Sequence, residues 1–193
     1  MLEPLIEYIN QRAQTHLSTS DIALLREVMV FKRYKKKQFL LQDGDVCKNL
    51  SFILKGATRQ YSVDEKGNEH IMALCIEGWW TGDRESYFRS VPSVYNIDAW
   101  EETEVLMLPK TELPRVSNIP AFAEMRMTLD ENYSIAAQKR VLVSISHSAE
   151  KRFEELAKTY PEFLQRFPQH IVASYLGITK ETLSRIRSQA ARK

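Results

Sequence analysis

The spacing of hydrophobic residues changes twice along the chain. Residues 2–30 have apolar positions at helical spacing, and the polar cluster at 18–21 is typical of the cap that begins a helix. Between residues 31 and 109, short apolar runs alternate with turns that contain Gly or Asp-Gly. Beyond residue 109 the helical spacing returns. The pattern predicts helices at both ends of the chain and a region of strands between them.

The strands expected in the middle region are short and regularly spaced. Turn residues separate each one from the next, which favours an antiparallel barrel or jelly roll. The expected strands are Gln38–Gln42, Leu50–Lys55, Ala57–Val63, His70–Ile76, Tyr95–Ala99 and Glu104–Leu108, of which the last two close the barrel.

A long helix is predicted at about 121–146, where the sequence contains neither glycine nor proline. It would span roughly 40 Å at about 1.5 Å per residue, which is more than a small barrel covers. We therefore expect a partner helix to cover its apolar stripe, with packing on the chain's own barrel as the alternative. The stripe consists of Phe122, Met125, Leu129, Tyr133, Ala136 and Val143.

The C-terminal residues predict a helix-turn-helix. Ser148 is expected to cap a helix that Pro161 ends, and two short helices then follow within 169–187. Ala173 supplies the small residue where two helices approach, and Gly177 supplies the turn. The expected shared core is Val172, Leu176, Ile178, Leu183 and Ile186, and Thr179 is placed to cap the second helix.

The outward side chains of the second helix suit DNA. Arg185 and Lys180 can bind guanine or phosphate, and Glu181 can accept a hydrogen bond from cytosine. The alternative is an ordinary helical hairpin with a solvated charged face. The candidate DNA-binding residues are Thr179, Lys180, Glu181, Thr182, Ser184, Arg185 and Arg187, with further positive charge from Arg192 and Lys193.

Composition narrows the class of protein. The chain has 193 residues, 27 basic against 25 acidic for a net charge of +2, and 44% hydrophobic residues, enough for one large domain or two modest ones. The apolar run Ile71–Ile76 is far shorter than the roughly 20 residues of a membrane helix, and no secretory signal is apparent. We expect no membrane association and a cytoplasmic location. Cys47 and Cys75 have no zinc-ligand spacing, so neither a structural metal nor a disulfide framework is expected.

The whole pattern resembles the Crp/Fnr transcription regulators. N-terminal helices precede a jelly roll with the strand Leu50–Lys55 and Gly56, and a long helix leads to the helix-turn-helix, whose segment 166–187 is the most specific part. The resemblance implies an α+β fold: an antiparallel β jelly-roll domain of the cyclic-nucleotide-binding type, a long dimerisation helix and a small winged-helix-like helix-turn-helix domain. It divides the chain into an effector domain with N-terminal helices (1–120), a dimerisation helix and hinge (121–147) and a DNA-binding domain (148–193).

The resemblance also implies partners. These are double-stranded DNA, a second copy of the chain in a homodimer, and RNA polymerase. In the family, the positions that match Thr179, Lys180, Glu181 and Arg185 meet DNA.

The effector site departs from the family pattern. Cyclic-nucleotide binders hold the ribose with a Gly-Glu pair and the phosphate with an Arg-Ser or Arg-Ala pair. The matching positions here are Gly82-Asp83 and Ser93-Val94, so the arginine is missing and a buried phosphate would lack its bidentate partner. We expect no useful binding of cyclic AMP or cyclic GMP. Arg84 or Arg89 could restore the charge, which makes the candidate ligand-binding residues Gly82, Asp83, Arg84, Arg89, Ser93 and Val94.

Other effectors stay open at this point. Aromatic residues around the same loop can fill the core or surround a different small molecule. Two cysteines are too few for an iron–sulfur cluster with four thiolate ligands, and His70 suits a structural role better than a haem ligand. No cofactor is expected. The aromatic residues concerned are Trp79, Trp80, Tyr87, Phe88 and Tyr95.

Three classes of function are weighed. The first is a transcription regulator that binds DNA. The second is an enzyme, which the sequence does not favour because it has no GxSxG, HExxH or phosphate-cradling glycine loop. The third is a nucleotide-sensing module that acts on a protein partner without binding DNA, and salt-dependent affinity for DNA would distinguish it from the first.

Overall fold

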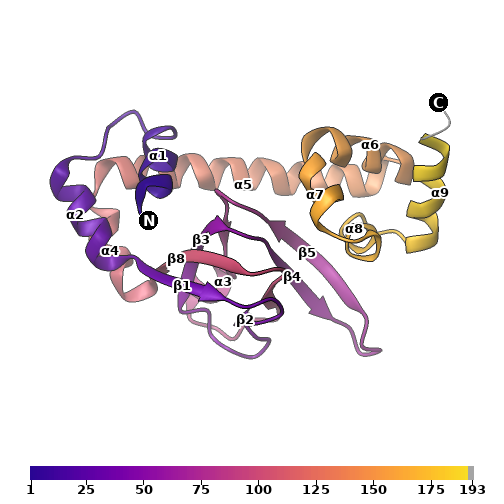
Figure 1. The fold of residues 1–193 in the computed structure, drawn as a ribbon, viewed down its shortest axis with the longest axis horizontal. Helices are drawn as coiled ribbons and strands as arrows, with labels where there is room; N and C mark the ends of the chain where they lie inside the picture. The colour runs from indigo at the N-terminus through magenta and orange to yellow at the C-terminus, as the bar shows by residue number, and fades with distance from the viewer. Residues whose placement is uncertain (191–193) are drawn as a thin grey trace.

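The computed structural model describes residues 1–190, and one helix, α5 (Pro120–Ser146), spans most of its length. Two β-sheets lie beside the middle of α5 (Figure 1). Helices α1 (Glu3–Asn10), α2 (Thr19–Val28) and α4 (Leu113–Ser117) gather at its N-terminal end, and the last four helices at its C-terminal end. None of the helices in the described part of the chain is long and apolar enough to cross a membrane.

The two sheets form an antiparallel β-roll. One has the strand order β1-β8-β3-β6 and the other β2-β7-β4-β5. The strands are β1 (Val30–Tyr34), β2 (Phe39–Leu41), β3 (Asn49–Lys55), β4 (Thr58–Val63), β5 (Glu69–Cys75), β6 (Trp80–Thr81), β7 (Asn96–Ala99) and β8 (Thr103–Pro109). All six predicted strands are confirmed with each boundary within one residue, whereas β1 and the two-residue β6 were not predicted.

Gly56 joins the two sheets at a point where no side chain fits. It follows β3 with φ of +97°, a conformation that residues with a Cβ rarely adopt. A Cβ there would lie 2.6 Å from the Glu102 carbonyl oxygen. This glycine therefore lets β3 turn into β4 directly against the segment that precedes β8.

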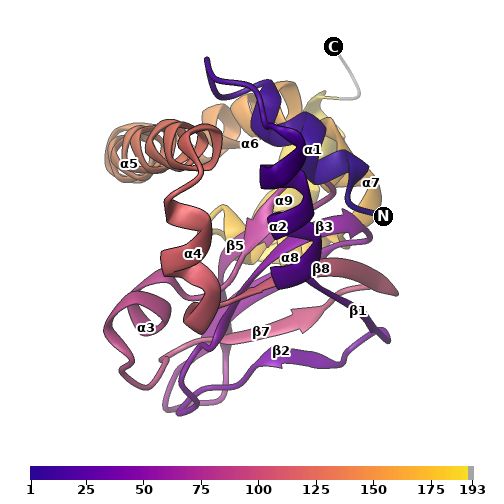
Figure 2. The same ribbon diagram turned by 90° about the vertical axis from the view of Figure 1, so that its left-hand side faces the viewer.

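The N-terminal helices and the first turns of α5 share one hydrophobic core with β3 and β8. Leu5 and Ile9 of α1 pack in the same cluster as Phe52 of β3 and Met125 of α5, each with at most 1% of its surface exposed. The predicted cap is confirmed, because Ser18 and Asp21 form a capping box at the start of α2. Figure 2, which views the molecule from the end that carries α1, α2 and α4, shows α5 on one side of the β-roll.

The predicted long helix is confirmed at Pro120–Ser146, but only its beginning is buried. In the expected stripe, Phe122 and Met125 are buried, Leu129 is half-buried against the N-terminal core, and Tyr133 is exposed. Beyond that point large apolar side chains face solvent in this single chain. They include Ile135 (51% exposed), Val141 (59%), Leu142 (61%) and Ile145 (80%).

The C-terminal part contains α6 (Ala149–Thr159), α7 (Pro161–Arg166), α8 (Gln169–Tyr175) and α9 (Lys180–Ala190). The predicted cap of α6 is confirmed, since the Ser148 hydroxyl accepts a hydrogen bond from the Lys151 amide. Pro161 ends α6 as expected but also begins α7, which was not predicted. No strand occurs between residues 110 and 190, so a β-wing is absent from the part of this domain that the structure describes.

Candidate DNA-reading helices and effector pocket

Helices α8 and α9 meet across the turn that the sequence predicts. Gly177 has φ of +65°, and the Ile178 amide donates to the Ala173 carbonyl at 3.0 Å, which closes the end of α8. Ala173 is 1% exposed, as a small residue between two helices should be. The Thr179 hydroxyl accepts from the Thr182 amide at 3.2 Å and so caps α9. The helix-turn-helix geometry is therefore confirmed.

Arg152 of α6 supports this turn, a role that sequence reasoning missed. Its guanidinium donates to the Leu176 carbonyl at 2.8 Å and lies near Gly177. Leu183 and Ile186 bury the inner face of α9 in the same cluster as Phe153 and Leu156 of α6. The side chains on the other face of α9 are thus held outward.

The outward face of α9 forms one side of a shallow groove of about 440 Å³. Lys180, Arg185 and Arg187 are exposed there or beside it, and none of the three forms an ion pair within residues 1–190. Thr182 is half-buried, with its hydroxyl 3.1 Å from that of Thr179. The groove is lined by Gln169, Lys180, Glu181, Ser184, Arg185 and Ser188; Gln169 and Ser188 were not predicted, and Arg192 and Lys193 lie outside the described residues.

Polar groups of the candidate effector loop, residues 79–95, form hydrogen bonds with one another. Asp83 is 6% exposed and caps α3 (Arg84–Arg89) by accepting from the Ser86 amide. The other carboxylate oxygen of Asp83 accepts from the Ser93 hydroxyl at 2.7 Å, and that hydroxyl also accepts from the Tyr95 amide. The two positions that match the family's ligand pairs therefore bond to each other.

The two arginines of this loop lie away from the interior of the β-roll. Arg84 pairs with Asp130 of α5, and its guanidinium lies 4.9 Å from the centre of the Tyr133 ring. Arg89 is exposed and pairs with Glu85 one turn earlier on α3. Val94 is 63% exposed. Of the six candidate ligand residues, Gly82 alone lines the cavity described next, and a ligand role for the others stays a prediction.

A cavity of about 440 Å³ lies inside the β-roll. The charged residues that line it, Asp45 and Lys48, lie on the exposed loop at its mouth, so the interior wall carries few charges. Of the loop aromatics, Tyr87 is fully buried and Trp80 packs on Phe52, so neither lines the cavity. The cavity is lined mainly by Tyr34, Leu40, Leu41, Cys47, Asn49, Ser51, Thr81, Gly82, Ile97 and Met107.

Both thiols are buried and held in the protonated form. Burial raises the pKa of the Cys75 thiol to about 11. Burial likewise raises the pKa of the Cys47 thiol above its ordinary value. Neither cysteine has the lowered pKa of a reactive thiol.

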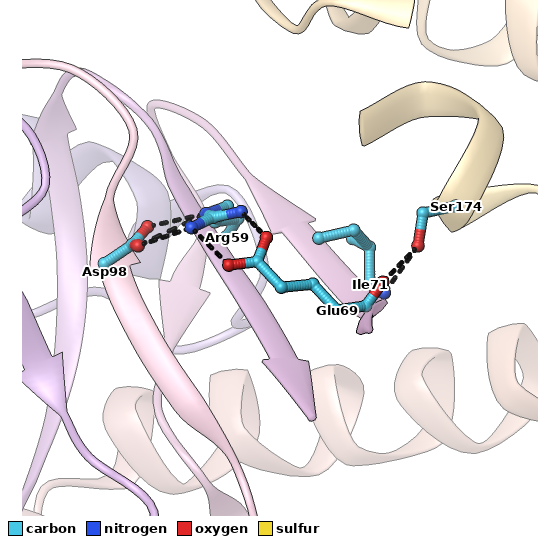
Figure 3. A network of polar contacts seen from close by, with 5 residues as sticks. All are labelled: Arg59, Glu69, Ile71, Asp98 and Ser174. Atoms are coloured by element: carbon cyan, nitrogen blue, oxygen red, sulfur yellow. Dashed lines mark hydrogen bonds and ion pairs between the residues drawn. The ribbon is translucent and has the colours of Figure 1, made fainter. Parts of the chain in front are cut away.

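A polar network connects the β-roll to α8 (Figure 3). Arg59 of β4 bonds to Asp98 of β7 and to Glu69 at the start of β5. Burial acts to lower the pKa of the Arg59 guanidinium, but the hydrogen bonds to Asp98 and Glu69 have the larger effect and raise that pKa. The Ser174 hydroxyl then accepts from the Ile71 amide at 3.0 Å and donates to the Glu69 carbonyl at 3.1 Å. Because β5 is an edge strand, these backbone groups have no neighbouring strand to bond to, and Ser174 forms hydrogen bonds with them instead.

The unpredicted helix α7 provides a second connection. Arg166 at its end pairs with Glu77 after β5 and with Glu101 after β7. Burial disfavours the Glu77 carboxylate, but Arg166 and the Gly56 amide outweigh it and lower the pKa of Glu77. The indole of Trp100 donates to the Arg166 carbonyl at 3.0 Å and packs on Phe167. The C-terminal helices are thus held against the β-roll at two places, through Ser174 of α8 and through Arg166 at the end of α7.

Comparison with known proteins agrees with this architecture. Residues 31–118 match the cyclic nucleotide-binding domain. Electron transport regulator A of Shewanella oneidensis is 25% identical over 183 residues, which cover 88% of this chain and 72% of that protein. The fumarate and nitrate reduction regulatory protein of Vibrio cholerae is 26% identical, with the same shares of 88% and 72% covered.

Solved structures share the fold. FixK2 from Bradyrhizobium japonicum has a TM-score of 0.70 at 18% identity, covering 86% of this chain and 85% of that chain. A CooA mutant from Carboxydothermus hydrogenoformans has a TM-score of 0.73 at 18% identity, covering 97% and 84%.

Fold and site together define a class of protein, a transcription regulator that joins a β-roll of the cyclic-nucleotide-binding type to a helix-turn-helix. In sequence and in fold the chain is similar to transcription regulators of the Crp/Fnr type. The relatives are regulators and not enzymes, and they do not favour the alternative of a module without DNA binding.

Proposed function

We propose that the protein is a homodimer that binds a two-fold related operator through α9 of each copy. The observation that carries this proposal is the outward face of α9, where Lys180 and Arg185 have no acidic partner within residues 1–190. Basic side chains at the N-terminal end of the second helix are placed to enter the major groove. The exposed apolar side chains in the second half of α5, between Ile135 and Ile145, supply the contact between copies.

Individual residues take distinct roles in this proposal. Arg185 and Lys180 bind guanine or phosphate, and Glu181 accepts from cytosine. Thr182 and Ser184 bind phosphate near the start of α9, where Thr179 caps the helix and also meets DNA, and Arg187 adds positive charge one turn later. The domain division follows the same scheme, with residues 1–120 as the effector domain, 121–147 as the dimerisation helix and hinge, and 148–193 as the DNA-binding domain.

The effector domain is proposed to act without cyclic AMP or cyclic GMP. Its ligand pairs bond to each other through Asp83 and Ser93, and Arg84 is engaged by Asp130. Any effector would be a small molecule of low charge that fits the cavity of about 440 Å³ in the β-roll. We propose no metal or other cofactor and no catalytic activity.

The remaining partner and location follow from the class of regulator. A protein that changes transcription from an operator works beside RNA polymerase, which we propose as its protein partner. Because its DNA target and the polymerase occupy the cytoplasm of a bacterium, we propose that location.

The test is selection of bound sequences from random duplex DNA with purified protein and no added ligand. We expect enrichment of a two-fold related sequence with half-sites about one helical turn apart. Failure to enrich any sequence, together with DNA binding that does not depend on salt concentration, would contradict the proposal.

A further inference from the structure

The β-roll and the C-terminal helices share one hydrophobic core. Ile71 and Leu74 of β5 lie in the same buried cluster as Phe163 of α7, Ile171 of α8 and Leu183 of α9, and each is at most 3% exposed. Domains that move freely relative to one another meet at smaller and more polar surfaces. The helix-turn-helix therefore packs on the β-roll as elements of a single domain pack on each other.

The edge of β5 bonds to two helices at once. The Ser174 hydroxyl of α8 accepts a hydrogen bond from the Ile71 amide at 3.0 Å (Figure 3). Arg140 of α5 donates to the carbonyls of Ile71 and Met72, and its guanidinium lies 4.5 Å from the centre of the Tyr175 ring of α8. The position of α8 is thus fixed relative to both the β-roll and α5.

Charged and aromatic side chains hold α7 on the β-roll in the same way. Arg166 pairs with Glu77 and Glu101. The ring of Trp79 packs on that of Phe163, with 6.0 Å between their centres. We call the bonds of Ser174 with β5, and of Arg166 with Glu77 and Glu101, the docking contacts.

The docking contacts leave free the face of α9 that is proposed to read DNA. They reach the β-roll from α7 and α8, through Arg166 and Ser174. Lys180 and Arg185 stay exposed beside their groove. A contact that blocked DNA would cover these side chains, so the docked arrangement is compatible with DNA binding.

We propose that the docking contacts hold α9 in its DNA-binding orientation with no effector bound. The proposal rests on the proposed function, because it takes α9 as the helix that reads the operator. If the helix-turn-helix is released in part of the molecules, the apparent affinity falls in proportion to the docked fraction. Weakening these contacts therefore lowers operator affinity, whereas weakening an inhibitory contact would raise it.

The first test variant is Glu77→Gln, a change on the β-roll. It removes the charge that pairs with Arg166, while the glutamine oxygen can still accept from the Gly56 amide. Loss of a negative charge would by itself leave DNA binding unchanged or strengthen it. We expect instead that the variant binds the selected operator about three- to tenfold more weakly by fluorescence anisotropy, as when about a third to a tenth of the molecules stay docked.

The second test variant is Ser174→Ala, which changes no charge. It removes the hydroxyl that bonds to Ile71, and we expect a decrease in affinity of similar size. Each variant has a matched control. Glu65→Gln changes an exposed glutamate on the turn between β4 and β5, and Ser146→Ala removes a hydroxyl that bonds only within α5. Both controls should bind the operator within about twofold of the unmodified protein.

Tryptophan fluorescence reports the docking itself. Two of the three tryptophans, Trp79 and Trp100, pack on Phe163 and Phe167 of the C-terminal part. Release of these helices exposes both indoles to water. The emission of both test variants should therefore shift to longer wavelength, while their far-ultraviolet circular dichroism stays that of the folded protein.

Several results would overturn the proposal. Tighter operator binding by either test variant would make the contact inhibitory. Affinity within twofold of the unmodified protein, with or without a shift in emission, would show that docking does not orient α9. An equal decrease in the controls would assign the effect to something other than docking. Failure of the unmodified protein to bind any operator would instead count against α9 and the proposed function.

Discussion

The α8–α9 pair and the effector loop at 79–95 both match functional segments of the family, yet their charged side chains behave differently. On α9, Lys180 and Arg185 are exposed beside an open groove. In the effector loop, Asp83 bonds to Ser93 and Arg84 pairs with Asp130. One segment keeps its polar groups available to a partner, whereas the other uses them to stabilise its own fold.

The difference shows how the loop at 79–95 can fold without the arginine that a cyclic nucleotide needs at position 93. Position 93 is serine where the family pattern has arginine, and a buried carboxylate without a partner is costly. The Ser93 hydroxyl and the α3 amide satisfy it within the loop. The polar groups of the loop are therefore satisfied by the chain itself.

The largest expected effect comes from separating the two copies. The variant Ile135→Glu/Leu142→Glu places charges seven residues apart among the exposed apolar side chains of α5, where they would be buried in the proposed dimer. We expect monomers by light scattering and operator affinity reduced by about a hundredfold or more, because two linked half-sites no longer bind together.

The control for this change is Ala137→Glu/Ser144→Glu, also seven residues apart and exposed but on the opposite face of α5. It should stay dimeric. Tyr133 is a poorer position for such a test because its ring packs against Arg84 of the same chain. A monomeric unmodified protein at micromolar concentration would contradict the proposed dimer.

The next effect contrasts an arginine from each segment. Arg185→Ala should weaken operator binding by about 1–3 kcal/mol, since the guanidinium that binds a base or a phosphate is removed. Arg89→Ala, on the exposed face of α3, should change it by less than about 0.5 kcal/mol. Titrations over a salt series separate the roles: relaxed preference at one base pair indicates base reading, and a uniform decrease in affinity indicates phosphate binding. Equal binding by the two variants would remove Arg185 from the interface.

Much of this fold could be predicted from the sequence because its signals are local. Turn glycines bound the strands, and Ala173 and Gly177 identify the helix-turn-helix from residues close in sequence. Strand β1 was not predicted because it is an edge strand, and its exposed Lys32 and Arg33 give it the polar sequence of a loop. Helix α7 escaped it because a proline that ends one helix can also begin another.

The long-range contacts that hold the effector loop, and those that connect the β-roll to α8, could not be predicted. Arg84 and Asp130 are 46 residues apart, and Ser174 reaches Ile71 across 103 residues. Neither pair leaves a pattern in the sequence. The missing arginine at position 93 suggested a degenerate pocket, but only the structure shows which groups bond to Asp83 in its place.

An effect of similar size is expected on stability when Asp83 is changed. Asp83→Ala removes the cap of α3 and leaves the buried Ser93 hydroxyl without its acceptor, which should lower the free energy of unfolding by about 1–3 kcal/mol. Asp45→Ala, an exposed aspartate at the mouth of the cavity, is the control and should change it by less than about 0.5 kcal/mol. Denaturant unfolding of both variants without ligand gives the comparison. Unchanged stability of the Asp83 variant would mean that its carboxylate is free for a ligand.

The smallest expected effect is that of cyclic nucleotides themselves. A ligand that binds the folded chain stabilises it by RT ln(1 + [L]/Kd), which is about 2.7 kcal/mol at a hundred times Kd. To bind here, a cyclic phosphate would have to displace Ser93 from Asp83 and draw Arg84 away from Asp130, with no arginine in place to receive it. We therefore expect no shift of the melting temperature with about 1 mM cyclic AMP or cyclic GMP, and no saturable heat in calorimetry. Binding tighter than about 10 μM that Arg84→Ala or Arg89→Ala abolishes would show instead that one of these arginines turns into the pocket and restores the missing charge.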